Sequence, residues 1–156
     1  MPELTSSTFT ALYAQYGEVF RLTTHEGADR ASLMQTVPGE FPGVYLIWKK
    51  GVPQPLYIGS SGKIGPDLSP SGSNVKRRLF GANTPYHFDM NAPVWRYGPT
   101  TAGVPPAGYS YEVPISDLRM SIFALPPPQA PAVLEHLLLQ GFINEFGRLP
   151  VANQKI

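Results

Sequence analysis

Residues 43–59 read GVYLIWKKGVPQPLYIG, and this stretch decides the fold. Gly43 to Trp48 is rich in valine, tyrosine, isoleucine and tryptophan, the residue types that favour β-strands. Leu56 to Gly59 forms a second apolar run, and the glycine and prolines between the two runs favour a turn. Two strands this close in sequence are expected to pair as an antiparallel hairpin. The hairpin is therefore the predicted centre of the fold.

The hairpin carries one tyrosine in each strand, Tyr45 and Tyr57, and Gly51 in the predicted turn is midway between them. An antiparallel pair without a bulge, centred on this glycine, places the two residues directly opposite each other on one face. We therefore predict that the two phenols lie side by side. The alternative is a pair of ordinary strand tyrosines packed on a core, because tyrosine is common in strands.

Regular structure elsewhere in the chain is predicted from apolar periodicity and capping residues. Apolar residues at helical spacing, with a capping residue or a glycine stop at the ends, predict three helices: 8–20, 74–80 and 130–146. A further strand is predicted at 120–125. Residues 21–40 are polar and poorly periodic, so we predict a loop with one helical turn from Asp29 to Met34.

Proline and glycine dominate the remaining segments. The chain holds 18 prolines, and each of them fixes φ and lacks an N–H donor. Residues 60–74 are predicted to be a loop, and residues 82–110 are too long for a plain connection, so we predict a functional insertion there. Within it, Trp95, Arg96 and Tyr97 have side chains that can stack on or contact nucleic acid. Ordinary core and surface packing is the equal alternative for these three residues.

Length and composition limit the classes of protein. A chain of 156 residues is expected to form one domain with a modest core. The absence of cysteine excludes disulfides, cysteine–zinc sites and thiol nucleophiles and fits a reducing compartment. No apolar run is long enough to span a bilayer, and Met1 to Thr10 lacks the features of a secretory signal. We therefore expect a cytoplasmic protein that does not associate with a membrane. The net charge of +1 does not itself indicate a nucleic-acid partner.

The helix predicted at 130–146 places a carboxylate on its apolar side. At about 100° per residue, four apolar residues fall within about 60° of Glu135 on the helical wheel: Leu138, Leu139, Phe142 and Phe146. A carboxylate turned towards a core is costly unless a cation or good donors accompany it, and a divalent metal is such a partner. Two alternatives carry equal weight: a buried arginine partner, or an edge position near the helix start that the helix dipole favours.

The helix predicted at 74–80 carries a second charged candidate. Val75 and Leu79 mark its inner side, Arg78 borders that side, and Arg77 points away from it. A guanidinium suits a scissile phosphate, because its fork binds two oxygens and it always stays charged. The alternative is a basic helix surface exposed to solvent.

Taken together, these features resemble the GIY-YIG nuclease superfamily. Gly43-Val44-Tyr45 differs from the first family triplet by valine in place of isoleucine, and Tyr57-Ile58-Gly59 matches the second triplet. Arg78 on a short helix, Glu135 on a later helix and Asn153 near the end of the chain follow in the family order. Five elements in this order are far more specific than either triplet alone.

The resemblance covers residues 42–153 of a single domain, 1–156, and leaves 1–40 as an N-terminal helical extension. It implies an α/β fold of the α+β type: a small three-stranded antiparallel sheet flanked by helices, here with long Pro/Gly-rich loop insertions. It also implies an endonuclease that hydrolyses DNA phosphodiester bonds with one divalent metal ion, Mg²⁺ or alternatively Mn²⁺. RNA is the alternative substrate. A homodimer or successive nicking would allow both strands to be cut.

The family also implies a role for each matching residue. Glu135 would hold the metal ion. Tyr45 would activate or orient the water, beside Tyr57 at the phosphate. Arg78 would stabilise charge in the transition state, and the metal would act as a Lewis acid. Asn153 would position either the tyrosine hairpin or Glu135 through hydrogen bonds.

One family position is not matched. A histidine or tyrosine often follows the arginine by one helical turn, where this chain has Ala82. His87, or Tyr86 beside it, is the predicted substitute from the following loop. The alternative to an enzyme is a non-catalytic nucleic-acid-binding module that keeps the fold. The presence of both Glu135 and Arg78 argues against that alternative.

Overall fold

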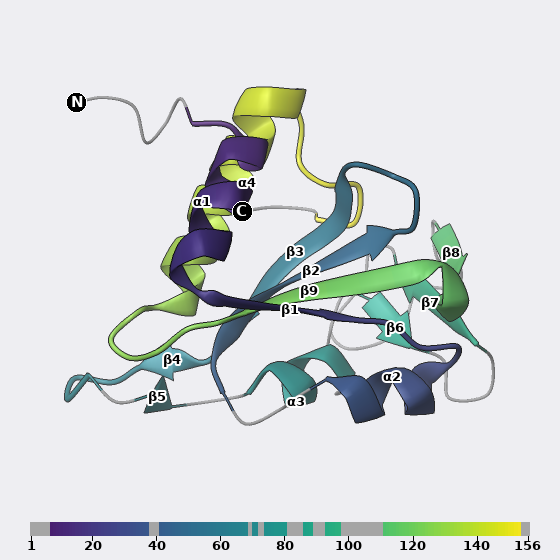
Figure 1. Cartoon of the computed structure of the whole chain (residues 1–156), viewed down its shortest axis with the longest axis horizontal. Coiled ribbons are helices and arrows are strands. Elements are labelled where there is room, and N and C mark those ends of the chain that lie inside the picture. Colours follow the sequence, from purple (N-terminus) through teal and green to yellow (C-terminus); the bar gives the residue numbers. More distant parts are fainter. Residues whose placement is uncertain are drawn as a thin grey trace.

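The computed structural model describes residues 7–37, 41–68, 70–71, 74–80, 86–88, 93–97 and 111–153 of the protein. Its centre is a four-stranded antiparallel sheet in the order β1-β9-β2-β3 (Figure 1). The strands have these bounds: β1 Arg21–His25, β2 Gly43–Lys49, β3 Pro55–Ser61 and β9 Leu118–Ala124. The predicted α+β class and the antiparallel sheet are confirmed, but this sheet has four strands rather than three.

The fourth strand, β1, shows that the prediction of a loop at its position was wrong. β1 pairs with β9, with Thr23 opposite Ile122, and forms one edge of the sheet while β3 forms the other. Of the five residues in β1, His25 alone is buried, so the strand has no regular alternation of buried and exposed side chains. A short edge strand of this kind gives a weak sequence signal, and its pairing with β9 determines its conformation.

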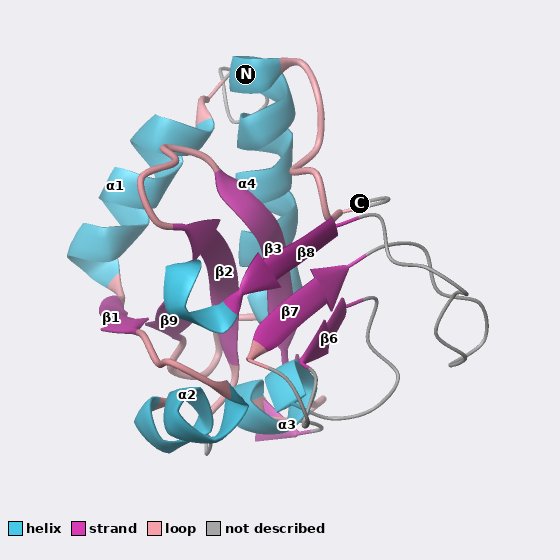
Figure 2. Ribbon diagram, turned by 90° about the vertical axis from the view of Figure 1, so that its right-hand side faces the viewer, coloured by secondary structure: helices cyan, strands magenta, loops and turns pink. Residues whose placement is uncertain are grey.

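Helices α1 (Phe9–Val19) and α4 (Pro131–Phe146) pack on one face of the sheet (Figure 2). α1 begins where the side chain of Thr8 accepts a hydrogen bond from the N–H of Ala11, as the sequence predicts. α4 ends at Gly147, whose φ of 73° is a left-handed conformation that glycine adopts without strain. Buried side chains fill the space between these helices and the sheet: Phe9, Leu12, Val44, Leu46, Ile58, Phe123, Leu138 and Phe142.

The two helices approach each other closely at Gly141. A Cβ atom at this position would lie 2.8 Å from Leu12 Cδ1 and 3.0 Å from the backbone nitrogen of Phe9. Replacing glycine by alanine inside a helix ordinarily stabilises it by about 1 kcal/mol. Here we expect overpacking to reverse the sign, so that Gly141→Ala lowers the free energy of unfolding by about 1–3 kcal/mol. Denaturant titration measures the change, and a gain in stability would show that α1 and α4 do not need this close contact.

The opposite face of the sheet is covered by α2 (Arg30–Thr36), α3 (Val75–Phe80) and a second, three-stranded sheet (Figure 2). The second sheet has the order β6-β7-β8, with these strands: β6 Tyr86–Phe88, β7 Val94–Tyr97 and β8 Tyr111–Pro114. A second buried cluster joins all of these elements: Leu33, Tyr45, Ile47, Tyr57, Val75, Leu79, Phe88, Trp95, Val113 and Ile122.

Short elements occupy segments for which the sequence predicts loops. β4 (Lys63–Ile64) pairs with β5 (Pro70–Ser71), and a 3-10 helix (Ile115–Asp117) leads into β9. Strands of two to four residues, here and in the second sheet, are too short to show a reliable period in the sequence. Among the described residues, no helix has the length and apolar character needed to cross a membrane.

His25 makes the stability of the fold depend on pH. The residue is 8% exposed, and its Nε2 lies 2.7 Å from Thr23 Oγ1. Burial lowers the pKa of His25 below its usual value, and a backbone hydrogen bond with Thr36 opposes this shift more weakly. The folded state therefore favours the neutral imidazole, so its contribution to stability is present above the unfolded pKa, about 6.5, and is lost as the pH falls below it.

We expect the free energy of unfolding to fall more steeply from about pH 7 to about pH 5 in the parent than in His25→Gln, because the variant has no titratable imidazole at this buried position. Denaturant titrations of both proteins at each pH measure the difference. Parallel pH profiles would contradict the assignment of this pH dependence to His25.

Candidate active site

The pairing of β2 with β3 brings Tyr45 and Tyr57 together on one face of the sheet. Their rings stack, with centroids 6.1 Å apart and planes inclined by 22°. The prediction that the two residues lie directly opposite each other is wrong, because Tyr45 is opposite Gly59 and Tyr57 is opposite Ile47. An irregularity between Ile47 and Trp48 shifts the register of the hairpin. The tyrosines are diagonal neighbours, a geometry in which aromatic side chains still reach each other.

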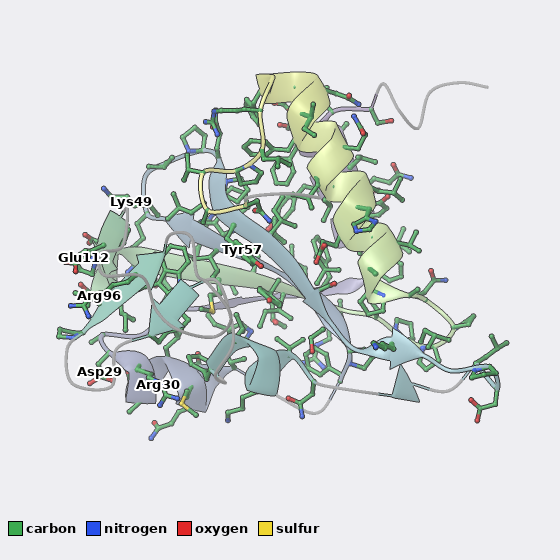
Figure 3. The ribbon with its side chains drawn as sticks, turned by 180° about the vertical axis from the view of Figure 1, so that it is seen from behind. Asp29, Arg30, Lys49, Tyr57, Arg96 and Glu112 are labelled. Atoms are coloured by element: carbon green, nitrogen blue, oxygen red, sulfur yellow. The ribbon has the colours of Figure 1, made fainter. Side chains whose placement is uncertain are left out.

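Both phenols lie between the sheet and the elements that cover this face. Tyr45 is completely buried, whereas Tyr57 keeps 8% of its surface exposed. Tyr57 lies on the edge strand β3 (Figure 3). α3 contacts both strands of the hairpin, and its residues Val75 and Leu79 belong to the same buried cluster as the tyrosines. Tyr57 is therefore the more accessible of the two phenols.

The second triplet ends in Gly59, which packs against both tyrosine rings. A Cβ atom at Gly59 would lie 2.7 Å from Cζ and Oη of Tyr45 and 2.7 Å from Cε1 of Tyr57. The glycine of the first triplet is also constrained, since a Cβ atom at Gly43 would lie 2.5 Å from the carbonyl oxygen of Phe123. Each triplet thus contains a glycine whose missing side chain makes room for the neighbouring rings or for the adjacent strand.

Asn153 binds the outer edge of the hairpin. Its Oδ1 accepts a hydrogen bond from the N–H of Ile58 at 2.9 Å, and its Nδ2 donates to the carbonyl of Ile58 at 2.9 Å. The preceding residue, Ala152, donates its N–H to the carbonyl of Leu56 at 2.9 Å, so residues 152 and 153 run along β3. Asn153 was predicted to position either the hairpin or Glu135, and the described hydrogen bonds of its side chain go to the hairpin.

Removing the Asn153 amide is expected to destabilise the protein. Asn153→Ala leaves the N–H and carbonyl of Ile58 without these partners and should lower the free energy of unfolding by about 1–3 kcal/mol. Asn153→Asp keeps the acceptor but places a carboxylate oxygen against the Ile58 carbonyl. Its loss relative to the parent should therefore shrink at acidic pH, where a protonated carboxyl can donate. Thermal denaturation of the two variants at several pH values measures these losses. An Asn153→Ala protein as stable as the parent would show that water replaces the amide fully.

Glu135 lies near the N-terminal end of α4, with 20% of its side chain exposed. Its Oε2 is 3.8 Å from Nε2 of His136, an exposed neighbour. The apolar stripe predicted around Glu135 is confirmed: Leu138, Leu139 and Phe142 are buried, and Phe146 is partly buried against the same cluster. α4 contacts β3 and β2, so Glu135 belongs to the helix that lies against the hairpin.

The donor chemistry of Glu135 fits a magnesium ion. A partly exposed carboxylate offers the hard oxygen ligand that Mg²⁺ prefers, and this ion usually keeps several waters and takes one or two carboxylates. Within the described parts of the chain, no group of three or more His, Asp or Glu side chains is arranged to hold a metal.

The side chains of Arg78, His87 and Tyr86 lie outside the described part of the chain, so their roles stay predictions. The backbone places Arg78 on α3, next to the buried Leu79. In the second sheet, the backbone register places His87 opposite Arg96.

The structure revises the prediction that residues 95–97 contact nucleic acid. Trp95 is completely buried in the core, so the packing interpretation is correct for this residue. Arg96 Nε lies 2.7 Å from Glu112 Oε1, in an ion pair on the second sheet (Figure 3). The side chain of Tyr97 lies outside the described residues.

No protein-family model matches the sequence, and no curated protein and no solved structure matches the chain. The resemblance to the GIY-YIG superfamily therefore depends on the residues of this chain alone.

One contact beside the tyrosine face was not predicted: Arg30 on α2 reaches Phe80 at the end of α3. The available sequence signal was Asp29, a good N-cap residue, directly before Arg30.

Proposed function

We propose that the protein is a metal-dependent endonuclease of the GIY-YIG type that hydrolyses phosphodiester bonds in DNA. The observation that carries this proposal is the stacking of Tyr45 and Tyr57 against Gly59, in a hairpin whose edge is held by Asn153. Ordinary core tyrosines need neither a glycine beside both rings nor a side-chain amide on the adjacent backbone. The combination favours a preorganised site, in which supporting residues fix the functional groups.

We also propose that β2, β3 and β9 are the three strands of the family sheet and that β1 enlarges it. The proposed setting is the cytoplasm, with DNA as the partner. Double-strand cleavage would proceed through a homodimer or by successive nicking.

The proposed reaction site is the edge of β3. The tyrosines pack on one face of the sheet, while α4, which carries Glu135, packs on the other. β3 is an edge strand, and Ala152 and Asn153 cover its first half at Leu56 and Ile58. The proposed position of the substrate is therefore the second half of this edge, between Tyr57 on one face of the sheet and Glu135 on the other. Figures 1 and 3 both show the N-terminal half of α4 alongside the C-terminal half of β3, in support of this arrangement.

Each residue has a separate task in the proposed reaction. Glu135 would hold the divalent metal ion, which would supply Lewis-acid polarisation of the phosphate. Tyr45 and Tyr57 orient the attacking water by hydrogen bonds through their hydroxyl groups. Arg78 neutralises charge that develops on the phosphate oxygens. Asn153 keeps the second triplet in place through the backbone of its central residue.

The proposal is tested by measuring DNA binding and DNA cleavage on one preparation. Binding should be measured at several salt concentrations, and cleavage on a supercoiled plasmid and a single-stranded circle with Mg²⁺ or Mn²⁺. Binding that weakens with salt, together with cleavage, supports the nuclease. Salt-sensitive binding without cleavage of either substrate would favour the non-catalytic module. A protein that neither binds nor cleaves DNA would contradict both functions.

A further inference from the structure

A contact joins α2 and α3 on the face of the sheet that carries the two tyrosines. Arg30 is the first residue of α2, and its Nη2 donates a hydrogen bond to the carbonyl oxygen of Phe80, the last residue of α3, at 3.1 Å. The same guanidinium lies 5.7 Å from the centre of the Phe80 ring. The last carbonyls of a helix lack partners within the helix, and a charged donor binds them more strongly than a neutral one. Arg30 therefore stabilises the C-terminal end of α3.

Arg30 is itself held in place by the capping of α2. The side chain of Asp29 accepts a hydrogen bond from the N–H of Ser32 at 2.8 Å, and Ser32 Oγ accepts one from the N–H of Asp29 at 3.1 Å. Leu33, completely buried, anchors the same helix in the core. Figures 1 and 2 show α2 and α3 side by side, and Figure 3 shows Arg30 and Asp29 at α2. The start of α2 is thus fixed on both its polar and its apolar side.

α3 needs such support because it has only six residues. A helix of this length is unstable by itself in water. At its start, the N–H of Val75 donates to the carbonyl of Phe41 at 3.3 Å. Along its inner side, Val75 and Leu79 are buried against the tyrosine face of the sheet. Tertiary contacts of this kind therefore determine the position of the helix.

At the other end of α3, Phe80 packs against Phe88 of the second sheet, with ring centroids 5.1 Å apart, and receives the hydrogen bond from Arg30. Arg78 is in the same final turn. We infer that Arg30 is a positioning residue, which fixes the last turn of α3 and thereby the placement of Arg78 at the phosphate. This inference rests on the proposed nuclease function. It also makes α2, which lies in the predicted N-terminal extension, part of the support of the site.

The test compares Arg30→Ala and Arg30→Lys with the parent and with Arg21→Ala, which removes one exposed arginine from β1 as a control. Hydrogen exchange of residues 75–80 should accelerate in Arg30→Ala. Its kcat for plasmid cleavage should fall about 10- to 100-fold with little change in KM, because a displaced group affects the reaction more than binding. Arg30→Lys should recover part of both losses, since lysine can donate to the Phe80 carbonyl. Arg21→Ala should behave like the parent.

A double-mutant cycle with Arg78→Ala identifies the route of the effect. If Arg30 acts through Arg78, the double variant should be no slower than Arg78→Ala alone. Fully additive losses, or unchanged exchange of α3 in Arg30→Ala, would overturn the inference. If the parent does not cleave DNA, the proposed function fails, and hydrogen exchange in Arg30→Ala and Arg30→Lys decides by itself whether Arg30 fixes α3.

Discussion

Replacing Glu135 by glutamine is expected to lower the rate of metal-dependent DNA cleavage at least about 100-fold, which corresponds to about 2.7 kcal/mol of transition-state stabilisation. Glutamine keeps the size of the side chain but removes the negative charge that attracts a divalent cation. The fold should be retained, because the side chain changes little in volume and is partly exposed. Single-turnover rates over a series of Mg²⁺ concentrations would separate weaker metal binding from a slower reaction.

Glu18→Gln is the matched control for this substitution. Glu18 is an exposed residue of α1, and its replacement changes the net charge by the same amount. We expect the rate of the parent in this variant. A Glu135→Gln protein with the rate and the metal dependence of the parent would remove Glu135 from the mechanism.

Gly59→Ala is expected to damage both the fold and the activity. The added methyl group would lie 2.7 Å from atoms of both tyrosine rings, and rigid rings cannot move aside as a flexible side chain does. Overpacking of this kind should lower the free energy of unfolding by about 1–3 kcal/mol. Displacement of the phenols by about 1 Å should reduce the cleavage rate about 100-fold in the protein that remains folded. Denaturant titration and cleavage rates, measured well below the unfolding transition, give the two effects separately.

The control for Gly59→Ala is Gly17→Ala on α1. A Cβ atom at Gly17 would meet Leu22 Cδ2 at 3.7 Å, an ordinary van der Waals distance. Because Gly17 is helical, alanine should stabilise the protein by about 0.5–1 kcal/mol and leave cleavage unchanged. A Gly59→Ala protein as stable and as active as the parent would show that the tyrosine positions are not constrained by this glycine.

The sequence predicts the parts of the fold whose signals are local. The helices α1, α3 and α4 follow from apolar residues at helical spacing, and Thr8 and Gly147 mark their ends as expected. The hairpin and β9 follow from apolar, β-favouring runs. β1 and the second sheet could not be predicted in this way, because their strands are short and depend on pairing with partners distant in sequence.

The candidate site shows the same limit. The shared face of Tyr45 and Tyr57 is predictable from the period of a strand, but their exact offset depends on an irregularity beside Ile47 that no local pattern reveals. The side chain of Asn153 hydrogen-bonds to the backbone of Ile58, which is distant in sequence. The sequence alone therefore left two candidate partners for Asn153, the hairpin and Glu135. The need for a glycine at position 59 is evident only from the structure, where the rings of Tyr45 and Tyr57 pack against it.

The most direct test of the nuclease is the conversion of supercoiled plasmid to its nicked form by the purified protein. The assay should contain Mg²⁺, then EDTA, then excess Mg²⁺ added back, with Glu135→Gln protein purified in parallel. We predict nicking that stops with EDTA, returns when Mg²⁺ is restored and is lost in Glu135→Gln. Nicking that persists in EDTA, or that Glu135→Gln retains at the rate of the parent, would contradict a metal-dependent site at the β3 edge.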